Sequence, residues 1–287
     1  MSSKFYPINK ISSVACIVLT KDNPIELSKT LQSILFQDFR ENLVIHVVES
    51  WNENHSINDT TDFFSPGFTK KQFSLKIHRI WPPPGIFQSM NEALNLLKNK
   101  FPKTTELIFL NSGDRFIDKS SLGNLFSHKR KMQKKIGMVF PAVFGRSKII
   151  ASDSLSWIMP DPKVRNLRKW LQYFNPNHQS VLFDARWAYE NPYNLDNILI
   201  ADRAIMNNAL SGLEEVAFSD KLISEFYLSG YSSQLPNWKN IKERVNEPDR
   251  SPISKVGESL KFLIPNRLKF IYPYLMLFRS KFISFFC

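Results

Sequence analysis

The chain has 287 residues, of which 43% are hydrophobic, and it carries 38 Lys and Arg residues against 26 Asp and Glu residues. This composition excludes intrinsic disorder as the main state, and the presence of only two cysteines excludes a disulfide framework and a Cys-rich zinc module. The net charge of +12 indicates an anionic partner, which leaves nucleic acid, a phospholipid surface and a phosphorylated small molecule open. The N-terminus lacks the pattern of a signal peptide, and no apolar stretch reaches the ~18 residues of a transmembrane helix, so the cytoplasm is the expected location.

The first predicted elements are a strand followed by a helix. The run 14–19 is apolar and rich in β-branched residues, which predicts a buried parallel strand. Pro24 suits the first turn of a helix, with either Asp22 or Asn23 as its cap. Apolar residues then recur at helical spacing over 25–37, which predicts an amphipathic helix.

The same alternation continues along the next seventy residues. The predicted elements are strands at 43–48, 74–80 and 106–110 and a helix at 89–98. This order is typical of an α/β fold with a largely parallel sheet, in which ligands bind beyond the carboxyl ends of the strands. The residues to consider therefore follow the strands: Thr20, Asp22 and Asn23 after the first, Glu49 after the second, Gly85 after the third and 111–114 after the fourth.

The second half of the chain is less regular. Strands are predicted at 138–144 and 181–184, and a helix at 202–210. From Trp238 to Pro252 the chain is charged and bounded by proline, as in a linker or surface helix. We therefore predict a catalytic domain at 1–236 and a basic, aromatic-rich extension at 237–287.

The strongest single chemical signal is an apolar strand that runs directly into an acidic turn, Phe109-Leu110-Asn111-Ser112-Gly113-Asp114. A carboxylate presented there could hold Mg²⁺ or Mn²⁺, which bind oxygen ligands and share their coordination with substrate phosphates. Taken alone, the same four turn-forming residues are equally consistent with an ordinary turn.

Five short motifs occur in a fixed order along 14–210. They are Thr20-x-Asp22-Asn23-Pro24, a strand ending at Glu49, Gly85-Ile86-Phe87-x-x-Met90-Asn91-x-Ala93, Phe109 to Asp114, and Asn177-His178-Gln179-Ser180-x-x-Phe183. In this order the sequence resembles the family 2 glycosyltransferases with the GT-A fold, and it is most similar to the bacterial branch that builds capsule, colanic-acid-type exopolysaccharide and lipopolysaccharide sugars. The resemblance implies a Rossmann-like mixed α/β sheet flanked by helices, here with a C-terminal helical extension. It also implies a hexosyltransferase-type enzyme that uses a UDP- or GDP-sugar, a lipid-linked or glycan acceptor, a metal ion and inversion at the sugar.

The resemblance also implies a role for each motif residue. The implied donor-binding residues are Thr20, Asp22, Asn23, Glu49, Gly85, Met90, Asn91, Asn111 and Gly113. Asp114 matches the metal-binding acid, and Asp202 matches the general base that takes a proton from the acceptor hydroxyl. His178 and Gln179 match a pair that lies near the phosphates or the acceptor.

Several of these residues also have a structural interpretation. Glu49 could instead be a solvated strand end, His178 a hydrogen-bonded structural histidine, and Asp202 a helix N-cap. Gln88 replaces an acid of the family pattern, and the acidic run that usually follows the second strand is absent. These departures leave a catalytically inactive, membrane-associated scaffold as an alternative.

The last fifty residues are both basic and aromatic. Residues 238–287 contain 10 Lys or Arg and four Asp or Glu, so they contribute +6 of the total of +12. Segment 259–287 suits an interfacial membrane helix broken by prolines, or a helix packed on the domain. We expect a cytoplasmic protein that is peripheral on the inner face of the membrane. Nucleic-acid binding through 129–131 and 163–169 is a weaker alternative because no nucleic-acid-binding signature is present, and no nucleic-acid partner is predicted.

Overall fold

The computed structural model describes residues 13–21, 23–39, 42–50, 73–80, 85–131, 138–146, 156–159, 164, 178–196, 201–212, 216–227, 252, 278 and 282. Asp22 and nearly all of the predicted extension 237–287 lie outside these residues. None of the helices within them is long and apolar enough to cross a membrane.

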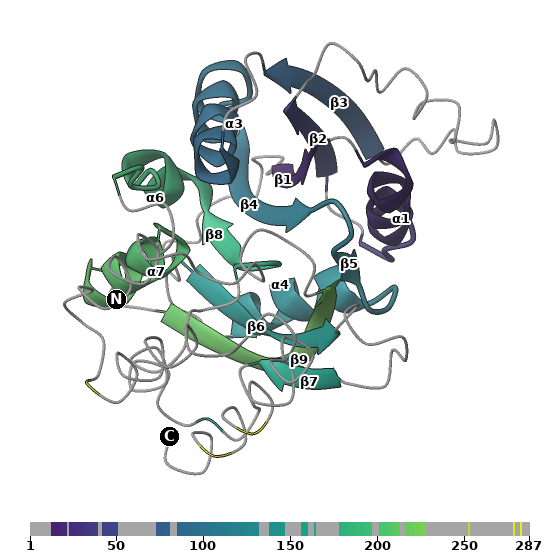
Figure 1. Cartoon of the computed structure of the whole chain (residues 1–287), viewed down its shortest axis with the longest axis vertical. Helices are drawn as coiled ribbons and strands as arrows, with labels where there is room; N and C mark the ends of the chain where they lie inside the picture. Colours follow the sequence, from purple (N-terminus) through teal and green to yellow (C-terminus); the bar gives the residue numbers. More distant parts are fainter. Residues whose placement is uncertain are drawn as a thin grey trace, which may run out of the picture.

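The described strands form one nine-stranded mixed sheet (Figure 1). They are β1 (Ser13–Thr20), β2 (Asn42–Ser50), β3 (Phe73–Ile80), β4 (Thr104–Asn111), β5 (Arg115–Phe116), β6 (Met138–Arg146), β7 (Ser156–Met159), β8 (Leu182–Asp184) and β9 (Val216–Tyr227). The order across the sheet is β3-β2-β1-β4-β8-β6-β9-β5, and β7 pairs with β6. The first four strands are parallel, whereas β8 is antiparallel to both β4 and β6. This arrangement confirms the predicted α/β class with a largely parallel sheet.

Helices cover both faces of the sheet. They are α1 (Pro24–Leu35), α3 (Ile86–Lys100), α4 (Ser121–Lys131), α6 (Ala185–Glu190) and α7 (Ala201–Gly212). Figure 1 shows α3, α6 and α7 on one side of the sheet and α1 on the other. The two hydrophobic clusters follow this division, because α1 and α4 contribute to one cluster and α3, α6 and α7 contribute to the other.

Strand β1 explains why the core has two halves. Its side chains alternate between the clusters, with Val14, Cys16 and Val18 in the first and Ala15, Ile17 and Leu19 in the second. A strand that is covered on both faces needs apolar residues at every position, and this is the continuous run seen in the sequence. The β1 run thus places the sheet at the centre of the molecule.

The predicted elements are confirmed with shifted ends. Helix α1 ends at Leu35, two residues earlier than predicted, and α3 begins at Ile86, three residues earlier. The early start of α3 follows from Gly85, which takes the N-cap position with an extended backbone. Elements β5, α4, β7, α6 and β9 were not predicted.

Candidate functional site

The carboxyl ends of the central strands bring three candidate residues together. Thr20 at the end of β1 lies directly opposite Glu49 on β2, and Leu19 lies opposite Asn111 on β4. Parallel pairing makes the strands end at one edge of the sheet, as the sequence predicts. Thr20 and Glu49 are both buried. This edge is therefore the candidate site.

Glu49 is held by a cation from the neighbouring strand. Its Oε2 lies 3.3 Å from Nε of Arg79 on β3, and its side chain is only 6% exposed. The register of the two strands places these residues opposite each other. Glu49 is therefore a buried partner of an ion pair and not a solvated strand end. Sequence reasoning did not single out Arg79.

The turn after β4 has a defined hydrogen-bonded shape. Asp114 Oδ2 accepts the Asn111 N–H at 2.9 Å, and the Asp114 N–H donates to the Asn111 carbonyl oxygen at 3.0 Å. The Ser112 N–H donates to the Leu19 carbonyl oxygen at 2.8 Å, which ties the turn to the end of β1. These bonds hold the Asp114 carboxylate at the sheet edge beside the ends of β1 and β4.

Gly113 allows this turn to form. Its φ is +103°, a conformation that side chains with a Cβ rarely adopt. The Gly113 N–H donates to Thr30 Oγ1 of α1 at 2.9 Å. Gly113 is therefore required by the backbone whether or not a donor also contacts it.

The turn is suited to a hard cation. Asn111 Oδ1 is buried and has no hydrogen-bond partner among the described residues, although burying an unpaired polar atom is costly. This amide oxygen and the Asp114 carboxylate are oxygen donors of the kind that Mg²⁺ and Mn²⁺ accept. Within the described ranges no group of three or more His, Cys, Asp or Glu gathers.

The predicted donor residues at the helix starts have different surroundings. Asn23 Oδ1 accepts the Glu26 N–H at 3.3 Å, so Asn23 is the cap of α1. Gly85 is exposed at the start of α3. Asp22 lies outside the described residues.

Met90 and Asn91 make contacts within the protein. Met90 is 2% exposed within the second hydrophobic cluster. The Asn91 amide pairs with the backbone of Tyr193, donating to its carbonyl oxygen at 2.9 Å and accepting its N–H at 2.8 Å. These contacts fix α3 to the chain between α6 and α7. A direct donor contact for either residue stays a prediction.

His178 is a buried, neutral histidine. A ring nitrogen contacts the hydroxyl of Tyr193, and the ring packs beside Phe109 and Phe183. Burial lowers the pKa of His178 from 6.5 to about 3. The imidazole therefore carries no charge at neutral pH and cannot act there as a cationic phosphate ligand. The structural interpretation of His178 thus has direct support.

The backbone beside this histidine is strained. Gln179 is half-buried, and Ser180 adopts a left-handed φ of 63° although it is not glycine. The Ser180 N–H donates to the carbonyl oxygen of Phe109 at 3.1 Å, which connects this segment to β4. Such conformations persist only where the surrounding structure imposes them, and they concentrate at functional sites.

Asp202 belongs to the same cluster. It is half-buried, and it is the second residue of α7. Burial raises the pKa of the Tyr193 phenol, and the nearby Asp202 charge raises it further. Tyr193 therefore contacts His178 and lies within electrostatic range of Asp202, and the sequence patterns did not single it out.

Replacing His178 with Phe is expected to change how stability depends on pH. The folded protein resists protonating His178 down to about pH 3, whereas the unfolded chain takes up that proton below about pH 6.5. The wild type therefore loses about 1.4 kcal/mol per pH unit through this residue as the pH falls below 6.5. At pH 7 the variant should be less stable, because the Tyr193 hydroxyl loses its partner.

The unfolding free energy of the wild type minus that of His178→Phe should shrink by about 2 kcal/mol between pH 7 and pH 5. Only the wild type has a histidine at 178 that stays neutral when folded and is protonated when unfolded. Urea unfolding at the two pH values measures this difference. His46, whose pKa burial lowers to about 4, is unchanged in both proteins and so cancels in the comparison. An equal difference at both pH values would contradict the assignment of His178 as a buried neutral histidine.

Comparisons with known proteins agree on the fold. No protein-family model matches the chain, and no curated protein is similar to it in sequence. A crystal structure of S. aureus TarS, residues 1–349, is 14% identical with a TM-score of 0.57, covering 88% of this chain and 70% of that one. The same protein in complex with UDP-GlcNAc is 14% identical with a TM-score of 0.56, covering 88% and 71%.

A second similar structure is the mannosyltransferase PcManGT from Pyrobaculum calidifontis, in complex with GDP-Man and Mn²⁺. It is 13% identical with a TM-score of 0.53, covering 81% of this chain and 59% of that one. At these identities the similarity shows the fold alone. The parallel-dominated mixed sheet matches that of GT-A glycosyltransferases, which confirms the predicted fold class.

Proposed function

We propose that this chain is a glycosyltransferase that moves a sugar from a UDP- or GDP-sugar to an acceptor hydroxyl. The observation that carries this proposal is the Asn111–Asp114 turn, which lies beside Thr20 and Glu49 at the carboxyl edge of a GT-A sheet. This edge is where α/β sheets bind ligands. Proteins of similar structure in complex with UDP-GlcNAc and with GDP-Man and Mn²⁺ support the choice of donor class.

In this proposal some residues bind the donor and the cation, and another accepts a proton. Thr20, Asn23 and Glu49 would contact the nucleoside, and Asp114 with Asn111 would hold Mg²⁺ or Mn²⁺ near the diphosphate. A cation bound there supplies positive charge to the departing nucleoside diphosphate. Asp202 takes the proton of the acceptor hydroxyl as that oxygen bonds to the anomeric carbon and the bond to the diphosphate breaks. A single displacement of this kind inverts the sugar.

We further propose membership of family 2 and a role in bacterial surface-polysaccharide synthesis, with a lipid-linked or glycan acceptor. In this proposal the domain is 1–236, and the extension 237–287 places the enzyme at the inner face of the cytoplasmic membrane. Phe278 and Phe282 support this position, since their rings stack with centroids 6.2 Å apart and are 71% and 57% exposed. Exposed aromatic rings among basic residues suit the headgroup region of a bilayer.

Nucleic-acid binding is less well supported by the described residues. Lys129, in the basic cluster 129–131, forms an ion pair with Glu106 and its side chain is 17% exposed. Glu106 therefore neutralises the charge of Lys129, so this member of the cluster is not available to bind phosphates.

A thermal-shift panel tests the donor class. UDP, GDP, UDP-GlcNAc and GDP-Man would each be added with MnCl₂ and with EDTA. Binding to the folded state stabilises it by about 2.7 kcal/mol when the ligand is at 100 times its Kd, and this raises Tm. We expect stabilisation by one nucleotide series and a larger shift with Mn²⁺. If none of these ligands shifts Tm, the inactive scaffold is the better description.

A further inference from the structure

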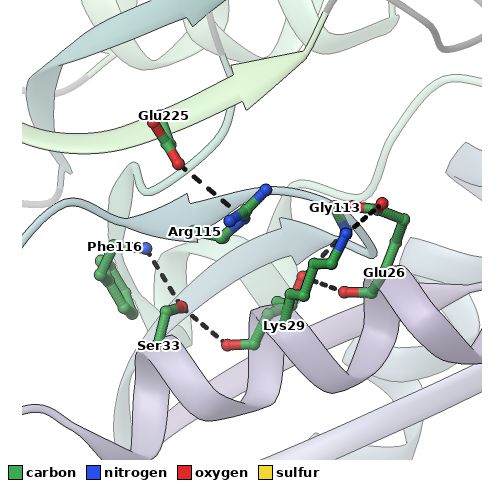
Figure 2. A network of polar contacts seen from close by, with 8 residues as sticks. Glu26, Lys29, Ser33, Gly113, Arg115, Phe116 and Glu225 are labelled. Atoms are coloured by element: carbon green, nitrogen blue, oxygen red, sulfur yellow. Dashed lines mark hydrogen bonds and ion pairs between the residues drawn. The ribbon is translucent and has the colours of Figure 1, made fainter.

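A polar stripe on α1 contacts the segment that carries Asp114. The stripe consists of Thr30, Ser33 and Gln37, the last of which lies just past the end of the helix. Thr30 Oγ1 accepts the Gly113 N–H at 2.9 Å, and Ser33 Oγ accepts the Phe116 N–H at 3.2 Å. Figure 2 shows Ser33 reaching the Phe116 N–H, with Arg115 between Phe116 and Gly113. The two bonds therefore bracket Asp114 and Arg115.

Bonds within the helix occupy the proton of each hydroxyl. Thr30 Oγ1 donates its proton to the Glu26 carbonyl oxygen at 3.1 Å, and Ser33 Oγ donates to the Thr30 carbonyl oxygen at 2.7 Å. A hydroxyl has one proton and two lone pairs, so each oxygen is left to accept a backbone N–H from the segment. Thr30 is fully buried, so its bond to Gly113 has no competition from bulk water.

Gln37 holds the far end of the same segment. Its Nε2 donates to the Asp118 carbonyl oxygen at 2.8 Å, and its Oε1 accepts the Leu122 N–H at 2.9 Å. On the other side, Arg115 Nε lies 3.8 Å from Glu225 Oε1 of β9, and β5 pairs with β9 at this position. The segment from Gly113 to Leu122 is thus held between α1 and β9.

We propose that Thr30 and Ser33 are positioning residues for Asp114. This role rests on the proposed function. The Thr30 hydroxyl fixes the Gly113 turn, the Ser33 hydroxyl holds the Phe116 N–H, and together they aim the Asp114 carboxylate at the cation. Gly113 has an unusual φ and its N–H points at one oxygen, so loss of that acceptor frees the turn next to the carboxylate. Asn23, a predicted donor contact, caps α1, the helix that carries Thr30. One helix therefore sets the spacing between Asn23 and the Gly113–Asp114 turn.

The test compares Thr30→Val, which keeps the shape and removes the acceptor, with Thr30→Ser, which keeps the acceptor. For each folded protein, Mn²⁺ is titrated against Tm in the presence of the nucleotide that stabilises the wild type. We expect Thr30→Val to need about tenfold more Mn²⁺ for half of the shift, and Thr30→Ser to match the wild type within about twofold. Metal-free Tm separates this effect from general stability, and amide exchange at Gly113 should be faster only in the valine variant.

If Thr30→Val does not fold, Ser33→Ala takes its place, because it removes the acceptor of the Phe116 N–H on the other side of Asp114. A valine variant, or an alanine variant in its stead, with the wild-type Mn²⁺ midpoint would overturn the positioning role and leave the proposed function intact. A wild type whose Tm responds to no nucleotide with Mn²⁺ would overturn the proposed function, and the inference with it.

Discussion

Replacing Asp114 with Asn is expected to lower kcat about 10³-fold, equivalent to about 4 kcal/mol of lost charge stabilisation in the transition state. The change removes the negative charge, and the Asn oxygen can still accept the Asn111 N–H that Asp114 Oδ2 accepts now. The turn should therefore keep its shape. The measurement is sugar transfer with Mn²⁺, together with the Mn²⁺-dependent part of the nucleotide-induced Tm shift, which should also disappear.

Asp118→Asn is the matched control for this variant. Asp118 is exposed four residues further along, and its Oδ1 accepts the Ser120 N–H at 2.7 Å, a bond that Asn can also make. The control carries the same charge change in the same segment, but at an exposed position outside the proposed cation site. It should therefore keep wild-type turnover and Mn²⁺ response. Equal turnover in Asp114→Asn and the wild type would show that Asp114 holds no catalytic cation.

The edge of the sheet could be predicted from the sequence because each parallel strand carries its own local signal. An apolar, β-branched run followed by a polar residue identifies the end of β1 at Thr20 and of β4 at Asn111 without any knowledge of neighbours. Parallel pairing then brings those ends together. The candidate metal-binding turn follows from the same reasoning, since Gly113 and Asp114 come shortly after a predicted strand end.

The residues around the turn were beyond such reasoning because their roles come from tertiary contacts. Tyr193 lies between α6 and α7 with no periodic pattern, and only the fold brings it to His178 and Asp202. Thr30 and Ser33 lie on a helix whose apolar residues identify the core face, and a polar residue on a helix usually faces water. Strand β9 mixes charged and apolar residues, so its assignment depends on pairing with β6 and β5.

A variant of Asp202 is expected to separate proton transfer from donor binding. Replacing it with Asn should lower kcat by about 10²–10⁴-fold, the usual contribution of a general base, while KM for the donor and the Mn²⁺-dependent Tm shift stay close to wild type. The amide keeps the size and polarity of the side chain at the start of α7 but cannot accept a proton from the acceptor hydroxyl. Asp114→Asn, in contrast, should lose both turnover and the Mn²⁺ response, so the two variants assign the two acids to different steps.

Asp196→Asn is the control for Asp202, since Asp196 is an exposed acid a few residues before α7. It should leave kcat unchanged, which separates the loss of a base from a change in surface charge. The pH profile supplies the independent reading, because the acidic limb of kcat that reports a carboxylate base should be present in the wild type and missing from the residual activity of Asp202→Asn. A variant that loses nucleotide binding together with turnover would instead place Asp202 in the donor site, and one that keeps full turnover would show that Asp202 is not the base.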